Sequence, residues 1–356
     1  MTTLRWPKEI RPVRIGALSL RLEVRALIWT VGVTLVAIAI GLWSLTVGSA
    51  GLGAADVFDA LSGRADASTT RIVVEWRLPR IVFALLGGAA LAIGGCVFQS
   101  VTRNPLGSPD IIGFSTGAYT GALLVSLLAA GSAGNTGSAL NTSLGALAGG
   151  LLTGAVVYLF AYRRGVTGMR IIVVGIGVSL FLGAFNTWVL TVMRREQALS
   201  AASWGAGSLN EIAWTHTIPL LVGLVIALPI LLSLQEGMRM LEMGDDTGRA
   251  LGVGAEPVRG ILLLVGIALV ALVTASAGPI AFVALAAPQL AMRAARTPGV
   301  RLLPSAAFGA LLLVIGDLIA RTVIAPAQLP VGVVTLCLGG AYLVWLLATH
   351  GRNGRP

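Results

Sequence analysis

Residues 79–102 read PRIVFALLGGAALAIGGCVFQSVT, with Arg80 as the only charged residue in the run. An uninterrupted apolar helix of this length crosses the hydrocarbon core of a membrane, which takes about 20 residues. Its glycines and alanines favour close helix packing, because helices in lipid associate through van der Waals contact and small side chains let their backbones approach. The run therefore predicts a transmembrane helix packed tightly among others.

Nine further apolar runs repeat this pattern along the chain. The whole sequence is 56% hydrophobic and 11% charged, and a water-soluble domain of this composition could not cover its surface with polar groups. The run at 279–292 is too short for a full crossing, so we expect a partial or broken helix there. The predicted fold is an all-α, polytopic transmembrane bundle of about ten spans, at 26–47, 79–102, 113–130, 140–161, 171–193, 213–234, 260–277, 279–292, 302–320 and 331–349.

The net charge of +10 comes from basic residues in short loops between apolar runs, which indicates membrane orientation and argues against a nucleic-acid partner. Most loop arginines fall on the cytoplasmic side if the basic segment 1–25 is cytoplasmic, as the positive-inside rule requires. The stretch before residue 26 is long for a signal peptide, and 26–47 is long enough to be a retained span. We therefore expect a multi-pass protein of the cytoplasmic (inner) membrane, with cytoplasmic tails at 1–25 and 350–356.

Several kinds of chemistry are excluded by residues that the chain lacks. Lys8 is the only lysine, so no Gly-rich phosphate-binding loop ending in Lys-Ser/Thr exists, and nucleotide energy must come from another subunit. Cys96 and Cys337 lie inside apolar runs, which argues against a disulfide framework or a cysteine metal site. We expect a transport subunit that is not an enzyme and holds no cofactor or metal of its own.

Asp317 is the clearest acid within an apolar run, and Arg321 follows four residues later on the same helical face. An ion pair near the membrane interface is the simpler interpretation. A proton relay, as in an ion-coupled secondary transporter, remains an alternative, although it requires a second ionisable partner inside the membrane.

Two segments between the spans are more than turns. The stretch 48–76 carries several acids and predicts an amphipathic segment on the outer side. The stretch 235–259 mixes acids, bases and apolar residues, which predicts one or two short helices broken at Gly244 and Gly252. This second stretch either binds a cytoplasmic partner or forms a solvated loop.

A series of runs, taken together and in order, resembles the FecCD family of importer permeases, which carry iron-siderophores, haem and cobalamin. The runs are RLPR at 77–80, RNPLGSPD at 103–110, LEMGDDT at 241–247, GPIAFV at 278–283, LPVGVVT at 329–335 and LGGAY at 338–342. The resemblance implies a type II ABC importer permease domain over 26–349. Further runs at 184–188 and 207–210 are similar to family members that carry ferric enterobactin, which implies a catecholate or related siderophore, with cobalamin or haem as the alternative. One departure is Gln289, where family members often have a histidine.

The resemblance also implies partners and sites. The implied partners are an ABC ATPase dimer that binds ATP and Mg, a second permease subunit that is a related chain rather than a copy, an extracytoplasmic siderophore-binding protein, the ferric siderophore and membrane lipid. Exposed ion pairs with the binding protein would involve Arg77, Arg80 and Arg321, although snorkelling to the membrane interface is an alternative for the first two. Coupling to the ATPase would involve Leu241, Gly244, Asp245, Asp246, Thr247, Arg249, Leu251 and Gly252, with an Asp or Thr capping the second short helix. The polar candidates for the translocation pathway are Gln99, Asn104, Ser143 and Thr153.

Overall fold

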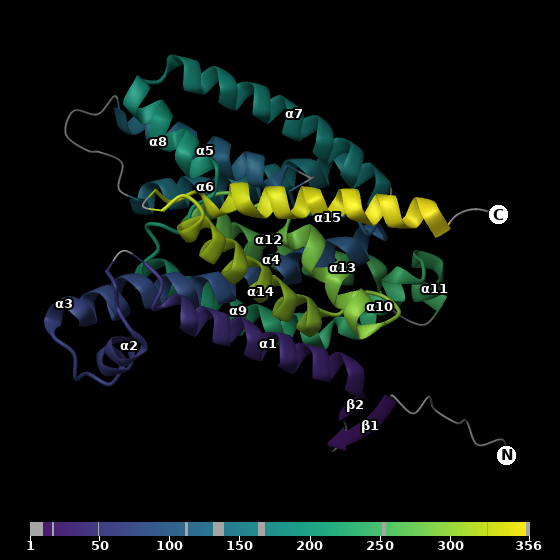
Figure 1. The fold of residues 1–356 in the computed structure, drawn as a ribbon. Coiled ribbons are helices and arrows are strands. Elements are labelled where there is room, and N and C mark those ends of the chain that lie inside the picture. Colours follow the sequence, from purple (N-terminus) through teal and green to yellow (C-terminus); the bar gives the residue numbers. More distant parts are fainter. Residues whose placement is uncertain are drawn as a thin grey trace.

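The computed structural model describes residues 10–15, 18–48, 50–110, 113–130, 139–162, 168–250, 254–325 and 327–353. Every one of the ten apolar runs is a helix (Figure 1). They are α1 (Val24–Ser44), α4 (Leu78–Thr102), α5 (Phe114–Ala130), α6 (Ala139–Ala161), α7 (Gly168–Val192), α9 (Trp214–Ser233), α12 (Ala255–Ala277), α13 (Val283–Ala295), α14 (Leu302–Thr322) and α15 (Val331–Asn353). Within the described residues, seven helical spans are long and apolar enough to cross a membrane, and two shorter apolar helices lie within α5 and α15.

The short span at 279–292 is confirmed as a partial helix. The chain is not helical from Gly278 to Ala281, Phe282 has a left-handed backbone with φ of 72°, and α13 then runs for 13 residues. The glycine and proline at 278–279 account for the break, because proline lacks the backbone N–H that a helix interior needs.

The helices are connected at one end of the bundle by further short elements. These are α2 (Ala54–Leu61), α3 (Ala67–Thr70), the π-helix η1 (Arg71–Arg77) and α8 (Arg195–Gly205). The amphipathic segment predicted at 48–76 is therefore largely helical. Figure 1 shows α2, α3 and α8 at one end of the bundle, here called the α8 end.

The opposite end, here called the α10 end, carries α10 (Gln235–Glu242) and α11 (Asp245–Ala250). The start of α1 and the end of α15 lie at this end too (Figure 1). It also carries an antiparallel hairpin of β1 (Ile10–Ile15) and β2 (Leu18–Glu23), within the N-terminal tail that was expected to be a simple basic segment. β2 (LSLRLE) alternates apolar and polar residues, which is the pattern of a strand, whereas Pro12 and Val13 interrupt the alternation in β1 (IRPVRI).

The centre of the bundle is α4, which packs against α14, α12, α13 and α9 and is buried along nearly its whole length. Glycines permit this packing: a Cβ atom added at Gly88 would overlap the carbonyl oxygen of Gly309 on α14. The same holds between α5 and α6, where a Cβ at Gly121 would overlap the carbonyl of Gly145. The close contact predicted from the small residues is therefore confirmed.

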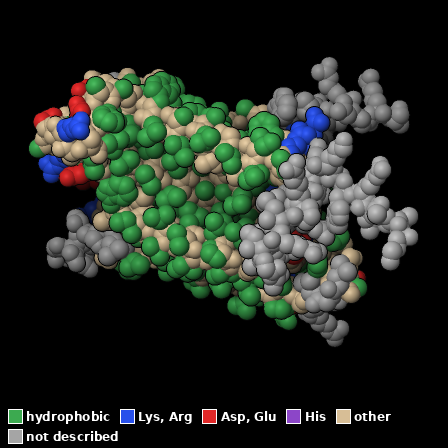
Figure 2. Space-filling model, turned by 90° about the horizontal axis from the view of Figure 1, so that it is seen from below, with side chains coloured by type: hydrophobic (Ala, Val, Ile, Leu, Met, Phe, Trp, Pro, Cys, Tyr) green, Lys and Arg blue, Asp and Glu red, His purple; other side chains and the backbone are tan. Residues whose placement is uncertain are grey.

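The outer surface of the bundle is apolar. Figure 2 shows hydrophobic side chains along its length, with charged side chains gathered towards its ends. Large apolar side chains face outward on α1, α7 and α9, including Ile28, Phe181 and Val225. This is the reverse of a water-soluble protein, and it fits a surface in contact with lipid.

Candidate docking and coupling sites

A buried charge cluster lies at the α8 end, where the start of α4 meets the end of α14. Asp317 Oδ1 accepts from Arg80 Nε at 2.9 Å and lies 2.7 Å from Arg80 Nη2. Arg80 Nη1 donates to Gln328 Oε1 at 2.9 Å. Arg80 and Asp317 are 237 residues apart in sequence, so their pairing ties two distant helices together.

Arg321 completes the cluster from one turn further along α14. Its Nε lies 3.1 Å from Asp317 Oδ2, which confirms the predicted ion pair four residues apart. The geometry is poorer than that of Arg80, since Nε and Nη2 of Arg321 are buried without a hydrogen-bond acceptor in the described residues.

The three arginines expected to dock a binding protein therefore differ in setting. The side chains of Arg80 and Arg321 are each 9% exposed, which departs from the exposed pairs expected from sequence. Arg77 is more open and ends η1, where its Nη1 donates to the carbonyl oxygen of Leu45 at 2.5 Å. Arg80 and Arg321 are buried because both pair with Asp317 on α14, and a buried carboxylate needs such partners to stabilise its charge. The docking role itself remains a prediction.

The segment at 235–259 forms two short helices, α10 and α11, as predicted. Gly244 breaks them with a left-handed φ of 119°, a conformation that glycine adopts without steric cost. The residue before α11 is Gly244, whose carbonyl accepts the first helical bond from the Gly248 N–H, so Asp245 begins the helix; capping by an Asp or Thr side chain stays a prediction. Asp246 and Thr247 are exposed on α11.

The structure describes the remaining predicted coupling residues to different extents. Leu241 is 1% exposed and faces the bundle rather than the surface. Leu251 and Gly252 lie outside the described residues, and only the backbone is described for Asp245 and Arg249.

One face of α10 is apolar and packs against the bundle. Met238 and Leu241, three residues apart, are both buried in the central core. A helix of eight residues is too short to be stable by itself, since isolated helices need about 12–15 residues. The position of α10 therefore depends on this packing.

Polar contacts fix the same helix to the end of α4. Arg103 Nε donates to the carbonyl oxygen of Leu241 at 2.7 Å, and the Ser100 hydroxyl donates to Glu242. Burial raises the pKa of Glu242, although the hydrogen bond from Ser100 and the nearby arginines oppose this. Because these partners are more than 100 residues from α10, sequence reasoning gave no indication of them.

A second set of ion pairs joins α10 to α1 and α14. Glu23, at the start of α1, lies 2.8 Å from Arg301 Nη2 and 3.8 Å from Arg239 Nη2 on α10. Movement of α10 would therefore act on α4, α1 and α14 together.

The predicted pathway residues occupy four different settings. Gln99 is buried between α4 and α13, where its Nε2 donates to Leu285 O at 3.0 Å and its Oε1 accepts from Gln289 Nε2 at 2.7 Å. Asn104 closes a turn by accepting from the Leu106 N–H at 2.9 Å. Gln289, the departure from the family pattern, is thus part of a buried amide pair.

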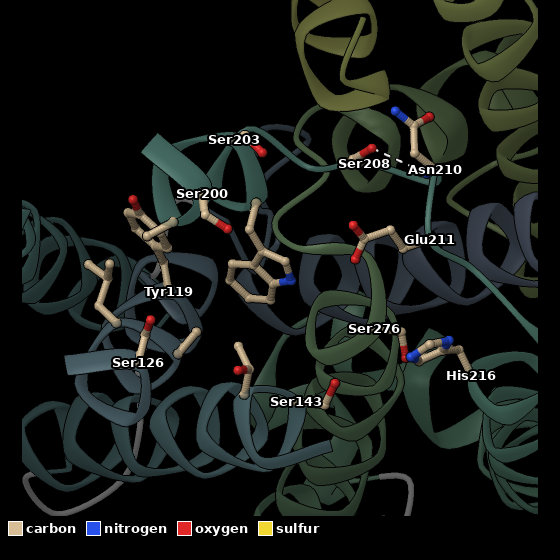
Figure 3. Close-up of a pocket in the computed structure, with 15 residues that line it drawn as sticks. Tyr119, Ser126, Ser143, Ser200, Ser203, Ser208, Asn210, Glu211, His216 and Ser276 are labelled. Atoms are coloured by element: carbon tan, nitrogen blue, oxygen red, sulfur yellow. Dashed lines mark hydrogen bonds between the residues drawn. The ribbon is translucent and has the colours of Figure 1, made fainter. Parts of the chain in front are cut away.

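Thr153 lies in the α5–α6 contact, where its hydroxyl donates to Gly149 O at 2.8 Å. Ser143 lines a cavity of about 440 Å³ at the α8 end, bounded by α5, α6, α8 and α12. Figure 3 shows Ser143 and Ser200 on opposite sides of this cavity and the carboxylate of Glu211 pointing between them. Of the four predicted residues, Ser143 is thus the one that lines this space.

The loop between α4 and α5 is organised by Asp110, the last residue of the RNPLGSPD run. Its carboxylate accepts from the Ser115 hydroxyl at 2.5 Å and from the Ser108 hydroxyl at 3.4 Å. Burial raises the pKa of Asp110, and these two hydroxyls partly offset the effect. The buried carboxylate of Asp110 therefore links Ser108 in the loop to Ser115 at the start of α5.

Within the described residues, no three or more His, Cys, Asp or Glu side chains are grouped to hold a metal ion, and both cysteines are free.

Comparison with known proteins gives consistent matches over most of the chain. The FecCD transport family matches residues 35–349. The ferric enterobactin transport system permease protein FepG of Escherichia coli (strain K12) is 47% identical over 313 residues, 88% of this chain and 93% of that protein. The iron(3+)-hydroxamate import system permease protein FhuG of Bacillus subtilis (strain 168) is 34% identical, over 85% of this chain and 91% of that protein. A metal-chelate type ABC transporter solved in an inward-facing conformation superposes with a TM-score of 0.78 at 27% identity, covering 90% of this chain and 98% of that one.

Proposed function

Because the chain belongs to the FecCD transport family, we propose that it is the membrane-spanning permease subunit of an ATP-driven importer of ferric siderophores. The observation that carries this proposal is the family match over 35–349 on a bundle of apolar helices. Like its relatives, which are permease proteins, the chain is a transport subunit and not an enzyme. Its cargo crosses the cytoplasmic membrane by alternating access, without covalent chemistry.

The proposed cargo is a ferric catecholate related to enterobactin. Identity is 47% to a permease named for ferric enterobactin and 34% to one named for iron-hydroxamate. The serine-lined cavity at the α8 end, with Ser143 in its wall, is the proposed start of the passage through this subunit.

The proposed energy source is a separate ATPase dimer that binds ATP and Mg and contacts α10 and α11. Two observations support this role: the helices project at one end of the bundle, and their buried face is tied to α4, α1 and α14. Exposed Asp246 and Thr247 are the side chains proposed to meet the ATPase. The α10 end and both termini would then be cytoplasmic, and the α8 end would face outward.

Two further partners complete the importer in this proposal. A siderophore-binding protein docks at the α8 end on Arg77 and its neighbours, and exposed ion pairs contribute only about 0.2–1 kcal/mol each, so several must act together. A second permease, a related chain rather than a copy, forms the other wall of the passage.

Reconstitution in vesicles tests the proposal. We expect uptake of ferric enterobactin only when the ATPase, the second permease and the binding protein are all present, with ferric hydroxamates taken up more slowly. Asp246→Ala should reduce uptake, while the matched change Glu196→Ala, on an exposed acid of α8 that does not line the cavity, should not. Uptake by the chain without any ATPase would refute the proposal and favour a secondary transporter.

A further inference from the structure

The cavity at the α8 end carries its charge on one side chain. Serine is the commonest residue in its wall, and Tyr119 and Trp204 add stacked aromatic rings whose centroids lie 6.2 Å apart. Among the described residues that line the cavity, Glu211 is the one acid, and neither lysine nor arginine is present. In Figure 3 the Glu211 carboxylate points into the space between these side chains. This part of the wall thus offers hydroxyl groups and aromatic faces, but no cation for an anionic ligand.

His216, which also lines the cavity, does not balance the charge of Glu211. Its Nδ1 accepts a hydrogen bond from the backbone N–H of Ala213 at 3.3 Å, so this nitrogen carries no proton. A protonated imidazole has a hydrogen on both ring nitrogens, and the ring is therefore neutral in this arrangement. The described wall of the cavity has a single net negative charge as a result.

The backbone around Glu211 is anchored, while its carboxylate has no partner. Leu209 and Ile212, which precede and follow it, are buried with 1% and 5% exposed. The Ser208 N–H also donates to the carbonyl oxygen of Ala277 on α12 at 2.7 Å. Glu211 itself is exposed and forms no ion pair or hydrogen bond with another described residue. The fold therefore places a negative charge at a fixed point of the cavity without neutralising it.

Ferric siderophores of different chemical classes respond differently to such a charge. Three catecholate groups, each doubly deprotonated, leave three net negative charges around Fe³⁺, whereas three hydroxamate groups leave none. A carboxylate repels the first chelate and has no net charge to act on in the second. Hydroxyl groups and aromatic faces, by contrast, can contact the organic part of either chelate.

We propose that Glu211 is a specificity-determining residue of this cavity: its charge opposes retention of a ferric catecholate, so that the chelate moves on, and leaves retention of a neutral ferric hydroxamate unaffected. This inference rests on the proposed function, since the cavity must receive a ferric siderophore. The serine hydroxyls and the Tyr119–Trp204 pair then supply the weak contacts that both classes share.

Equilibrium binding to the importer in lipid nanodiscs tests this inference. The ATPase and the second permease are present, whereas ATP and the binding protein are omitted, and the probes are ferric enterobactin and ferrichrome, a neutral ferric trihydroxamate. Glu211→Gln should lower the Kd for ferric enterobactin about three- to tenfold at about 0.1 M salt, as expected for one charge against three at roughly 8–10 Å in water with partial screening. The effect should nearly vanish at about 1 M salt, where the Debye length is about 3 Å, and the Kd for ferrichrome should stay within about twofold of wild type.

Two variants control for other causes. Glu196→Gln removes an exposed acid of α8 that does not line the cavity and should change neither Kd. Ser143→Trp fills the cavity and should weaken binding of both chelates.

The inference is overturned if Glu211→Gln leaves the Kd for ferric enterobactin unchanged, lowers both Kd values alike, or keeps its effect at high salt. It is equally overturned if Ser143→Trp leaves binding unaltered, because the chelates would then bind elsewhere. Uptake by the complete importer in vesicles separates this from the proposed function. If wild type takes up no ferric siderophore, the proposed function fails, whereas normal uptake with an unaltered Kd in Glu211→Gln refutes the inference alone.

Discussion

Truncation of Leu241 to alanine should detach α10 from the bundle without unfolding the rest of the protein. Leu241 is 1% exposed, and buried Leu→Ala changes cost about 2–5 kcal/mol. At 1.4 kcal/mol per tenfold, the equilibrium between packed and detached α10 would shift roughly thirtyfold to several thousandfold towards the detached form. Because eight residues do not hold a helix in water alone, detachment should also unwind it.

Hydrogen exchange and transport together measure this effect. In reconstituted importer, amide exchange over residues 235–242 should accelerate by more than about tenfold, exchange in α12 should be unchanged, and ATP-driven uptake should fall in parallel. Leu241→Met is the matched control, since a volume-conserving swap costs under about 1.5 kcal/mol and should retain most of the uptake. Accelerated exchange with normal uptake in Leu241→Ala would show that packing of α10 is irrelevant to coupling, and unchanged exchange would refute the detachment itself.

Three further predictions concern single side chains. Gly88→Ala should lower the free energy of unfolding by about 1–3 kcal/mol or more, and with it the melting temperature, because the new methyl overlaps the backbone of α14. Gly177→Ala is the control, since its methyl meets no atom within 4 Å and should leave the melting temperature unchanged. Equal effects of the two substitutions would contradict the packing argument. Burial raises the pKa of Glu242, so its stabilising contribution is present below the ordinary value of 4.5 and is lost as pH rises. Glu242→Gln stays neutral, and its melting temperature relative to wild type should therefore increase from pH 5 to pH 8; a constant difference would show that burial does not control this group. Gln289→Leu leaves Gln99 Oε1 without its donor and should destabilise by about 1–3 kcal/mol in thermal unfolding, while Gln289→His can still donate and should be tolerated; the opposite order would exclude the amide pair as the cause.

The membrane class, the ten helical runs and the short helices near 235–250 could all be predicted from sequence. Each depends on residues that are neighbours in the chain: the length of an apolar run, or a glycine between two polar stretches. The Asp317–Arg321 pair belongs to the same group, because four residues on a helix bring two side chains together. The hairpin at 10–23 was not predicted, although β2 alternates apolar and polar residues; β1 does not, and its pairing with β2 is not a property of either segment alone.

The settings of the predicted site residues could not be read in this way. Whether Arg80 is exposed or buried depends on an aspartate 237 positions away, and whether Gln99 lines a passage depends on Gln289, 190 positions away. Composition and periodicity fix which segments enter the membrane, because lipid selects for apolar runs one segment at a time. Which polar groups then face one another is decided only when the helices pack, since that contact joins residues with no local relation in the chain.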